Sequence, residues 1–162
     1  MNIYKFLDHH QINYRRFDHP AVFTCDEAAQ LVPEMPGIKS KNLFVRDRRG
    51  KRHILLIVPA EKVVDLKATS IALGVSGLSF ASPERLMKHL GIEAGSVSFL
   101  SIYNNIENTV EVIFDKEIWN SEYLQCHPLI NTSTLLISHA DVVKILQLTN
   151  HKYRIIDTPH RN

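Results

Sequence analysis

The chain has 162 residues, of which 44% are hydrophobic and 22% charged, and its formal net charge is +2. A chain of this length is expected to form one domain, residues 1–162, that buries about two-thirds of its unfolded surface. No apolar run approaches the roughly 20 residues that cross a bilayer, and the N-terminus lacks the apolar stretch of a secretory signal. We therefore expect a cytoplasmic protein without a membrane segment.

The first part of the chain is expected to alternate helix and strand. Residues 2–10 carry apolar side chains at the i, i+3, i+4 spacing of a helix with one buried face. A short strand around residues 14–17 follows. Thr24 and Glu27 form a capping-box pattern, which predicts a helix over residues 25–31.

A β-hairpin is predicted next, with strands over residues 41–47 and 53–58. The second strand is apolar on both faces, which places it in the middle of a sheet. In the first strand, Lys41 shares a face with Leu43 and Val45, so an ammonium group stands where a core residue would otherwise stand. Either the lysine extends into solvent from the start of the strand, or it holds an anionic ligand there.

The rest of the chain is predicted to contain short helices and strands without a regular βαβ rhythm. Helices are expected over residues 62–73, 83–90 and 141–148, with one helical turn within 115–120. Strands are expected over residues 78–80, 100–103, 110–114, 123–127, 134–137 and 153–156. The pattern predicts an α+β fold with a mixed, mostly antiparallel central sheet flanked by helices.

Basic residues gather between positions 39 and 52, where the only local acid is Asp47. They are Lys39, Lys41, Arg46, Arg48, Arg49, Lys51 and Arg52. Such a cluster is typical either of a patch that binds nucleic acid or of a solvated hairpin tip. In the first case, affinity for nucleic acid should fall as the salt concentration rises.

Familiar catalytic and metal-binding signatures are absent from the sequence. It contains no P-loop, no Gly-x-Ser-x-Gly elbow, no His-Glu-x-x-His motif and no cysteine pair with zinc spacing. Cys25 and Cys126 lie far apart, which is typical of free thiols in a reducing compartment. The sequence therefore predicts neither a metal ion nor another cofactor.

Three separate segments combine residue types that suit hydrolysis of an ester by water. A lysine can hold a phosphate or polarise a carbonyl, an amide can orient a substrate, and the backbone N–H groups of a glycine loop can stabilise an oxyanion. Each residue also has a structural alternative: a strand cap, a turn or a hydrogen-bonded corner. The candidates are Lys41, Asn42 and His127, with the loop Gly95, Ser96, Val97, Ser98 and Phe99.

Segments 19–24, 41–47 and 126–132 resemble, in this order, the YbaK/ProX family of aminoacyl-tRNA editing domains. Their sequences are HPAVFT, KNLFVRD and CHPLINT. The resemblance is greatest to freestanding deacylases of alanyl-tRNA(Pro). It implies an α+β editing domain that hydrolyses the ester at the acceptor end of an aminoacylated tRNA. It also implies that no metal is needed and that prolyl-tRNA synthetase is a candidate partner.

The resemblance also implies roles for particular residues. Lys41 matches a strand lysine that holds the terminal adenosine, and Asn42 and His127 match neighbouring pocket residues. Gly95 begins a loop whose backbone lies near the ester. The sequence departs from the family at Phe99, where a proline is usual. Proline fixes φ and lacks an amide donor, so Phe99 is expected either to redirect the loop or to fill part of the amino-acid pocket.

Two further sets of residues are expected to form the amino-acid pocket and the tRNA-binding surface. Side chains expected either to line the amino-acid pocket or simply to pack in the core are Val22, Phe23, Phe44 and Phe99. Residues expected to contact the tRNA are Lys39, Arg46, Arg48 and Arg49.

A second sieve explains why such an enzyme would be needed. A prolyl-tRNA synthetase rejects the smaller alanine by only about 1 to 3 kcal/mol, whereas a small hydrolytic pocket can exclude proline sterically. Removal of alanine is therefore the first expectation. The alternatives are removal of serine, threonine or cysteine, or a non-catalytic module that binds tRNA or a protein partner and has an altered glycine loop.

Overall fold

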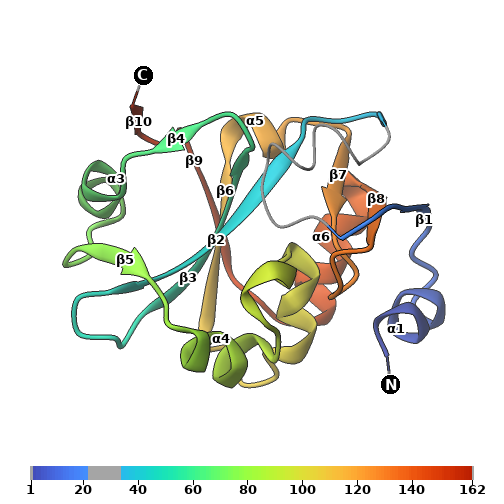
Figure 1. The fold of residues 1–162 in the computed structure, drawn as a ribbon, viewed down its shortest axis with the longest axis horizontal. Helices are drawn as coiled ribbons and strands as arrows, with labels where there is room; N and C mark the ends of the chain where they lie inside the picture. Colours follow the sequence, from blue (N-terminus) through green and yellow to red (C-terminus); the bar gives the residue numbers. More distant parts are fainter. Residues whose placement is uncertain (1, 22–33, 162) are drawn as a thin grey trace.

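The computed structural model describes residues 2–21 and 34–161, which form an α+β fold with helices packed around two main sheets (Figure 1). Most strand pairings within these ranges are antiparallel, although the larger sheet also contains parallel pairs. The predicted fold class is therefore confirmed. None of the helices in the described ranges is long and apolar enough to cross a membrane.

The larger sheet has five strands in the order β5-β2-β3-β6-β9. Their bounds are β2 (Ser40–Asp47), β3 (His53–Pro59), β5 (Leu78–Phe80), β6 (Val110–Asp115) and β9 (Tyr153–Ile156). β5, β2 and β3 pair antiparallel, whereas β3, β6 and β9 pair parallel. Every residue of β3 is buried, which confirms its predicted place inside the sheet.

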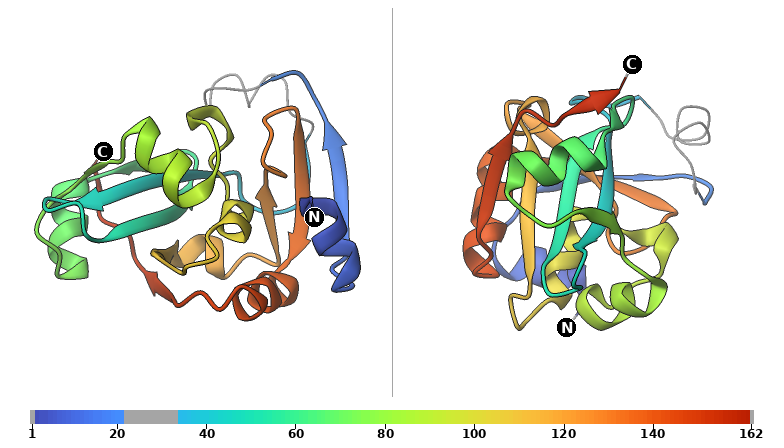
Figure 2. Two further views of the ribbon diagram at one scale, coloured as in Figure 1. Left: turned by 90° about the horizontal axis from the view of Figure 1, so that it is seen from below. Right: turned by 90° about the vertical axis from the view of Figure 1, so that its left-hand side faces the viewer.

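The second main sheet is antiparallel and lies beside the end of the larger one (Figure 2). It contains β1 (Tyr14–Asp18), β8 (Ser133–Ser138) and β7 (Tyr123–Cys126), in the order β1-β8-β7. A short pair, β4 (Val63–Val64) with β10 (His160–Arg161), lies near the C-terminus. The start of β2 adjoins the second sheet, because Ile38 forms a parallel bridge with Leu124 of β7.

Local capping residues explain the bounds of the helices. Ser82 accepts a hydrogen bond from the backbone N–H of Arg85, and Pro83 occupies the first position of α4. Gly91 ends that helix with a left-handed φ of 64°. The described helices are α1 (Ile3–His9), α3 (Leu66–Leu73), α4 (Pro83–Leu90), α5 (Lys116–Trp119), α6 (His139–Leu148) and the 3-10 helices η1 (Ala94–Ser96) and η2 (Phe99–Asn104).

The hydrophobic core consists of two clusters on opposite faces of the five-stranded sheet. The larger cluster joins this sheet to the second sheet and includes Phe44, Ile57 and Phe114. The smaller cluster, packed beneath α3, includes Val45 and Leu56. Because side chains alternate along a strand, each position of β2 belongs to one of these two faces.

The helix predicted over residues 62–73 is shorter in the structure. Val63 and Val64 form strand β4, and the helix begins only after Asp65. Asp65 has extended backbone angles, and its carboxylate accepts a hydrogen bond from the backbone N–H of Ala68. An N-cap at this position fixes the first turn of α3, so the two preceding valines pair with the C-terminal strand instead.

The strand predicted over residues 100–103 is wrong, because this segment forms the 3-10 helix η2. The Ser98 hydroxyl accepts a hydrogen bond from Leu100 N–H, and the Ser101 hydroxyl accepts one from Ser98 N–H. These reciprocal bonds favour a helical turn over an extended chain. The predicted hairpin partner, β6, instead lies parallel to β3. The helix predicted over residues 25–31 lies outside the described residues.

His53 is a buried imidazole beneath the β2–β3 turn, and its environment keeps it neutral. Arg85 Nη1 donates to His53 Nε2 at 2.9 Å, and the ring centroid of His89 is 4.0 Å from that of His53. Burial, together with the positive charge of Arg85 and the proximity of His89, lowers the pKa of His53 from 6.5 to about 4. The protonated form is therefore disfavoured in the folded protein.

We expect the free energy of unfolding to decrease as the pH falls from about 6.5 to about 4. In this window the unfolded chain binds a proton at residue 53, whereas the folded chain does not. The free energy of unfolding therefore decreases by ~3 kcal/mol from this group. Urea unfolding at several pH values measures this pH dependence of the free energy of unfolding. His53→Gln retains an acceptor for Arg85 but cannot titrate, so its acid dependence should be weaker. An unchanged pH slope in this variant would contradict the assignment.

Candidate functional site

The candidate site lies where the start of β2 meets the second sheet. The Ser40 hydroxyl donates to the backbone carbonyl of Gln125 on β7 at 3.0 Å, which ties the two sheets together. Lys41 and Asn42 follow directly, opposite Val58 and Ile57 of β3. The two neighbouring residues singled out from the sequence therefore lie at this junction.

Asn42 carries an unsatisfied polar atom. Its side-chain oxygen Oδ1 is buried and has no hydrogen-bond partner among the described residues. By alternation along β2, the side chain lies on the face of Phe44, toward the second sheet. A buried acceptor without a partner costs about 1 to 3 kcal/mol, so this oxygen is well placed to receive a donor from a ligand.

The backbone beside Asn42 is also open on one side. Ala60 N–H donates to the carbonyl of Lys39, so in the antiparallel ladder Lys39 and Lys41 turn their backbone groups toward β3. Ser40 and Asn42 therefore turn theirs toward the other edge, where pairing with β5 begins only at Val45. Within the described part of the chain, no strand pairs with Asn42 on this edge, although β7 adjoins the edge at Ser40.

The side chain of Lys41 lies on the face of β2 opposite to that of Asn42. It is half-buried and shares its face with Leu43 and Val45. No residue of the described ranges forms an ion pair with its ammonium group. The positive charge is therefore available to an anion at the start of the strand.

His127 lies at the corner that follows β7 and has a defined tautomer. Its Nδ1–H donates to the backbone carbonyl of Ser133 at 2.9 Å, which leaves Nε2 as the unprotonated nitrogen. Burial lowers the pKa of His127, and the nearby His19 adds to this effect. The imidazole is consequently neutral near pH 7 and can accept a hydrogen bond at Nε2.

The glycine loop is fastened to the same corner. Gly95 and Ser96 belong to η1, and the fully buried Ser98 donates its hydroxyl proton to the backbone carbonyl of His127 at 2.6 Å. Val97 packs against the larger core cluster. The structure thus joins the loop to His127, while Asn42 lies on the face of β2 that turns toward the second sheet.

Phe99 and Phe44 both pack in the core. Phe99 has no exposed surface, and its ring centroid lies 5.7 Å from that of Phe114. It is the first residue of η2, a position where an N–H has no intrahelical partner and where proline is also tolerated. The loop therefore accommodates phenylalanine in place of proline, and the core-packing alternative describes both side chains. Val22 and Phe23 lie outside the described residues.

The basic residues of the hairpin lie at the far end of β2. Arg46 donates to the backbone carbonyls of Asp47 and Arg48, and Arg48 and Arg49 are exposed in the turn. A cavity of about 350 Å³ is lined by Arg46, Arg48, Gly77, Leu78 and Ser79. Arg48 follows Lys41 by seven positions, which corresponds to roughly 23 Å of extended chain. Lys39 is exposed at the other end, before β2.

His19 is a neighbour of the site that the sequence analysis did not single out. Its Nδ1–H donates to the carbonyl of Pro20 at 2.9 Å, and its Nε2 accepts a hydrogen bond from the Thr134 hydroxyl at 2.8 Å. The ring centroid lies 6.3 Å from that of His127. Its place in the family-like HPAVFT segment was the only sequence signal for it.

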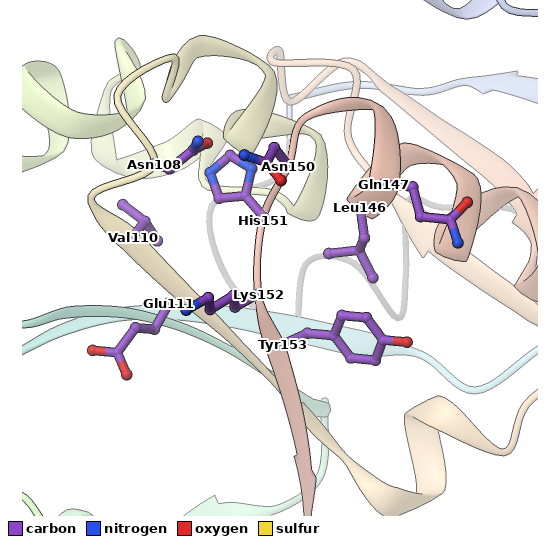
Figure 3. A pocket seen from close by; sticks show the side chains of 9 residues that line it. All are labelled: Asn108, Val110, Glu111, Leu146, Gln147, Asn150, His151, Lys152 and Tyr153. Carbon is purple, nitrogen blue, oxygen red and sulfur yellow. The ribbon is translucent and has the colours of Figure 1, made fainter.

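A separate cavity of about 460 Å³ lies between β6, β9 and the end of α6, and none of the predicted site residues lines it (Figure 3). Its lining residues are Asn108, Val110, Glu111, Leu146, Gln147, Asn150, His151, Lys152 and Tyr153. No group of acidic, histidine or cysteine side chains suited to a metal ion occurs among the described residues.

Comparisons with known proteins identify the family. Residues 19–145 match the aminoacyl-tRNA editing domain. The chain is 34% identical over 151 residues to the prolyl-tRNA editing protein ProX of Acetoanaerobium sticklandii, an alignment that covers 93% of this chain and 92% of the relative. It is 30% identical over 149 residues to prolyl-tRNA synthetase associated domain-containing protein 1 of Danio rerio, covering 91% and 80% of the two chains.

A solved structure shows the same fold. It is described as a candidate trans-editing enzyme for prolyl tRNA synthetase and superimposes with a TM-score of 0.69, 17% sequence identity and coverage of 98% of this chain and 96% of that one. The match of the domain model over most of the chain, together with the similarity to ProX, shows that this chain belongs to the aminoacyl-tRNA editing domain (YbaK/ProX) family of deacylases.

Proposed function

We propose that the chain acts as a single domain, residues 1–162, that hydrolyses the aminoacyl ester of mischarged tRNA(Pro), with alanine as the amino acid removed. The observation that carries this proposal is the buried Oδ1 of Asn42, which has no partner among the described residues and lies on the face of β2 toward the second sheet. An aminoacyl group carries an ammonium donor next to its ester. Asn42 Oδ1 accepts a hydrogen bond from that ammonium and so orients the ester.

In the proposed reaction, water attacks the ester carbonyl and forms a tetrahedral intermediate. Backbone N–H groups of the loop beginning at Gly95 stabilise the oxyanion. The bond between the carbonyl carbon and the ribose oxygen then breaks, and the proton lost by water passes to that oxygen. The products are the free amino acid and a tRNA with an intact terminal hydroxyl. His127 Nε2 accepts a hydrogen bond from the attacking water or from a ribose hydroxyl and orients it.

The charged residues hold the nucleic acid on either side of this chemistry. Lys41 binds the terminal adenosine end, and the exposed Arg48 and Arg49 contact phosphates of the acceptor stem, with Arg46 and Lys39 adding positive charge. The separation of roughly 23 Å along β2 spans several nucleotides. In the cytoplasm, where charged tRNA is present, this surface would give an affinity that falls with salt.

Two alternatives concern the same site. Removal of serine, threonine or cysteine would require the same ester chemistry with a more polar amino-acid pocket. A non-catalytic module that binds tRNA or prolyl-tRNA synthetase would require a displaced loop. The Ser98 bond to the His127 carbonyl keeps the loop beside the site despite Phe99, which favours turnover.

The substrate is tested by following the loss of labelled amino acid from purified tRNA(Pro) charged separately with alanine and with proline, and from tRNA charged with serine, threonine or cysteine. We expect rapid loss of alanine and no loss of proline above the spontaneous rate. Preferential loss of one of the other amino acids would replace alanine in the proposal. Binding of charged tRNA without loss of any amino acid would favour the binding module.

A further inference from the structure

β9 forms an open edge of the five-stranded sheet. It pairs only with β6 among the described residues, and its residues Tyr153 and Ile155 are 39% and 42% exposed. Val112 N–H donates to the carbonyl of Lys152, so in this parallel ladder Lys152 and Arg154 turn their backbone groups toward β6. The N–H and C=O groups of Tyr153 and Ile155 therefore point outward and are free to pair with another strand.

Two cavities of about 460 Å³ adjoin this edge and share part of their lining, Glu111, His151, Lys152 and Tyr153. One, on the side of α6, is lined by Leu146, Gln147 and Tyr153 among others (Figure 3). The other is lined by residues of β6 and β9, including Ile113, Lys152 and Arg154. When an extended peptide joins a sheet edge, its side chains alternate between the two faces. The two cavities are placed to receive side chains of such a peptide.

The charge of the edge indicates which side chains the peptide would carry. Lys152 and Arg154 are exposed and share one face, and neither pairs with a carboxylate of the described ranges. Glu111, an acid that lines the same cavity, accepts two hydrogen bonds from Arg52, at 2.9 and 2.6 Å. This face therefore complements acidic side chains. A second copy of the chain would instead bring Lys152 and Arg154 against like charges.

The opposite face of the edge is aromatic. Tyr153 stacks on Trp119 with ring centroids 5.0 Å apart, and Ile155 lies on the same face two residues later. Apolar side chains of an added strand would pack here. We propose that β9 is a docking edge for an extended segment of a protein partner in which acidic and apolar residues alternate.

The chain contains a single tryptophan, so the fluorescence of Trp119 reports on this edge. The probe is a synthetic peptide of repeated Glu-Val units, titrated into the full chain, with a Lys-Val peptide as the charge control. We expect a saturable change in fluorescence with the acidic peptide and none with the basic one. Absence of binding, or equal binding of the basic peptide, would overturn the proposal.

Two variants separate strand pairing from simple charge attraction. Ile155→Pro removes an outward N–H without affecting the ladder to β6 and should weaken peptide binding about 10-fold or more, whereas Ile155→Thr retains the N–H and should bind much as the wild type does. Arg154→Glu should also weaken binding. Unfolding curves and deacylation assays check that each variant is folded, since β9 takes no part in the proposed reaction.

Other occupants would give distinct results. Concentration-dependent dimerisation that Ile155→Pro abolishes, without peptide binding, would assign the edge to a second copy of the chain. Binding of single-stranded oligouridylate that Arg154→Glu abolishes would assign it to RNA. Either outcome would overturn the peptide proposal while leaving the proposed deacylase activity untouched.

Discussion

Lys41→Ala should reduce kcat/KM for deacylation by about 100-fold or more. Lys41 is half-buried at the start of β2, on the face opposite to Asn42, and has no ion-pair partner among the described residues. Removing one preorganised electrostatic contact from a catalytic site costs about 10²- to 10³-fold. Single-turnover hydrolysis of the preferred charged tRNA measures the effect.

Lys41→Arg and Lys41→Met separate charge from packing. Arginine keeps the charge but spreads it over a planar group, so partial activity is expected, whereas methionine keeps most of the aliphatic stem and should be as inactive as alanine. Full activity in Lys41→Met would show that the charge is dispensable and would remove Lys41 from the proposed mechanism. Unchanged unfolding curves are the control, because no described residue depends on the ammonium group.

Asp115→Ala should produce a large loss of stability. Asp115 is fully buried, and its carboxylate accepts hydrogen bonds from Lys62 Nζ at 2.8 Å and from the backbone N–H groups of Glu117 and Thr158. Burial alone would raise its pKa, but these bonds hold the pKa below its ordinary value. Breaking a buried pair leaves an uncompensated charge and costs about 3 to 5 kcal/mol.

Thermal and urea unfolding measure this loss, which corresponds to a decrease in Tm of roughly 6 to 20 °C. In the double variant Lys62→Met with Asp115→Asn, the unpaired ammonium group is absent and the amide oxygen can still accept from one of the two backbone donors. This variant should be more stable than Asp115→Ala. If Asp115→Ala unfolded at the wild-type temperature, the Lys62–Asp115 pair would contribute nothing to the fold.

Much of the local structure could be predicted because its signals act within a few residues. The sequence Ser82-Pro83 begins α4 and Gly91 ends it, as their chemistry requires. The apolar run of β3 predicted a central strand, and that strand is buried throughout. The start of β2, which carries Lys41 and Asn42, adjoins β7, the strand that leads to His127.

Errors arose where a local cap was missed and where distant residues determine the outcome. The apolar segment 100–103 was assigned to a strand, but Ser98 and Ser101 close a 3-10 turn, and the bond from Ser98 to His127 joins residues far apart in the sequence. The departure at Phe99 could be seen in the sequence. Its consequence could not, because burial against Phe114 depends on how η2 packs on β6.

The sequence by itself determined the family, the capped helices, the central hairpin and the residue types of the candidate site. Only the tertiary structure established that β6 and β9 run parallel to β3, that Asn42 Oδ1 is buried without a partner among the described residues, and that His127 carries its proton on Nδ1. Caps and hydrophobic periodicity depend on neighbouring residues. Strand order, burial and tautomers depend on contacts between distant segments, which no local pattern contains.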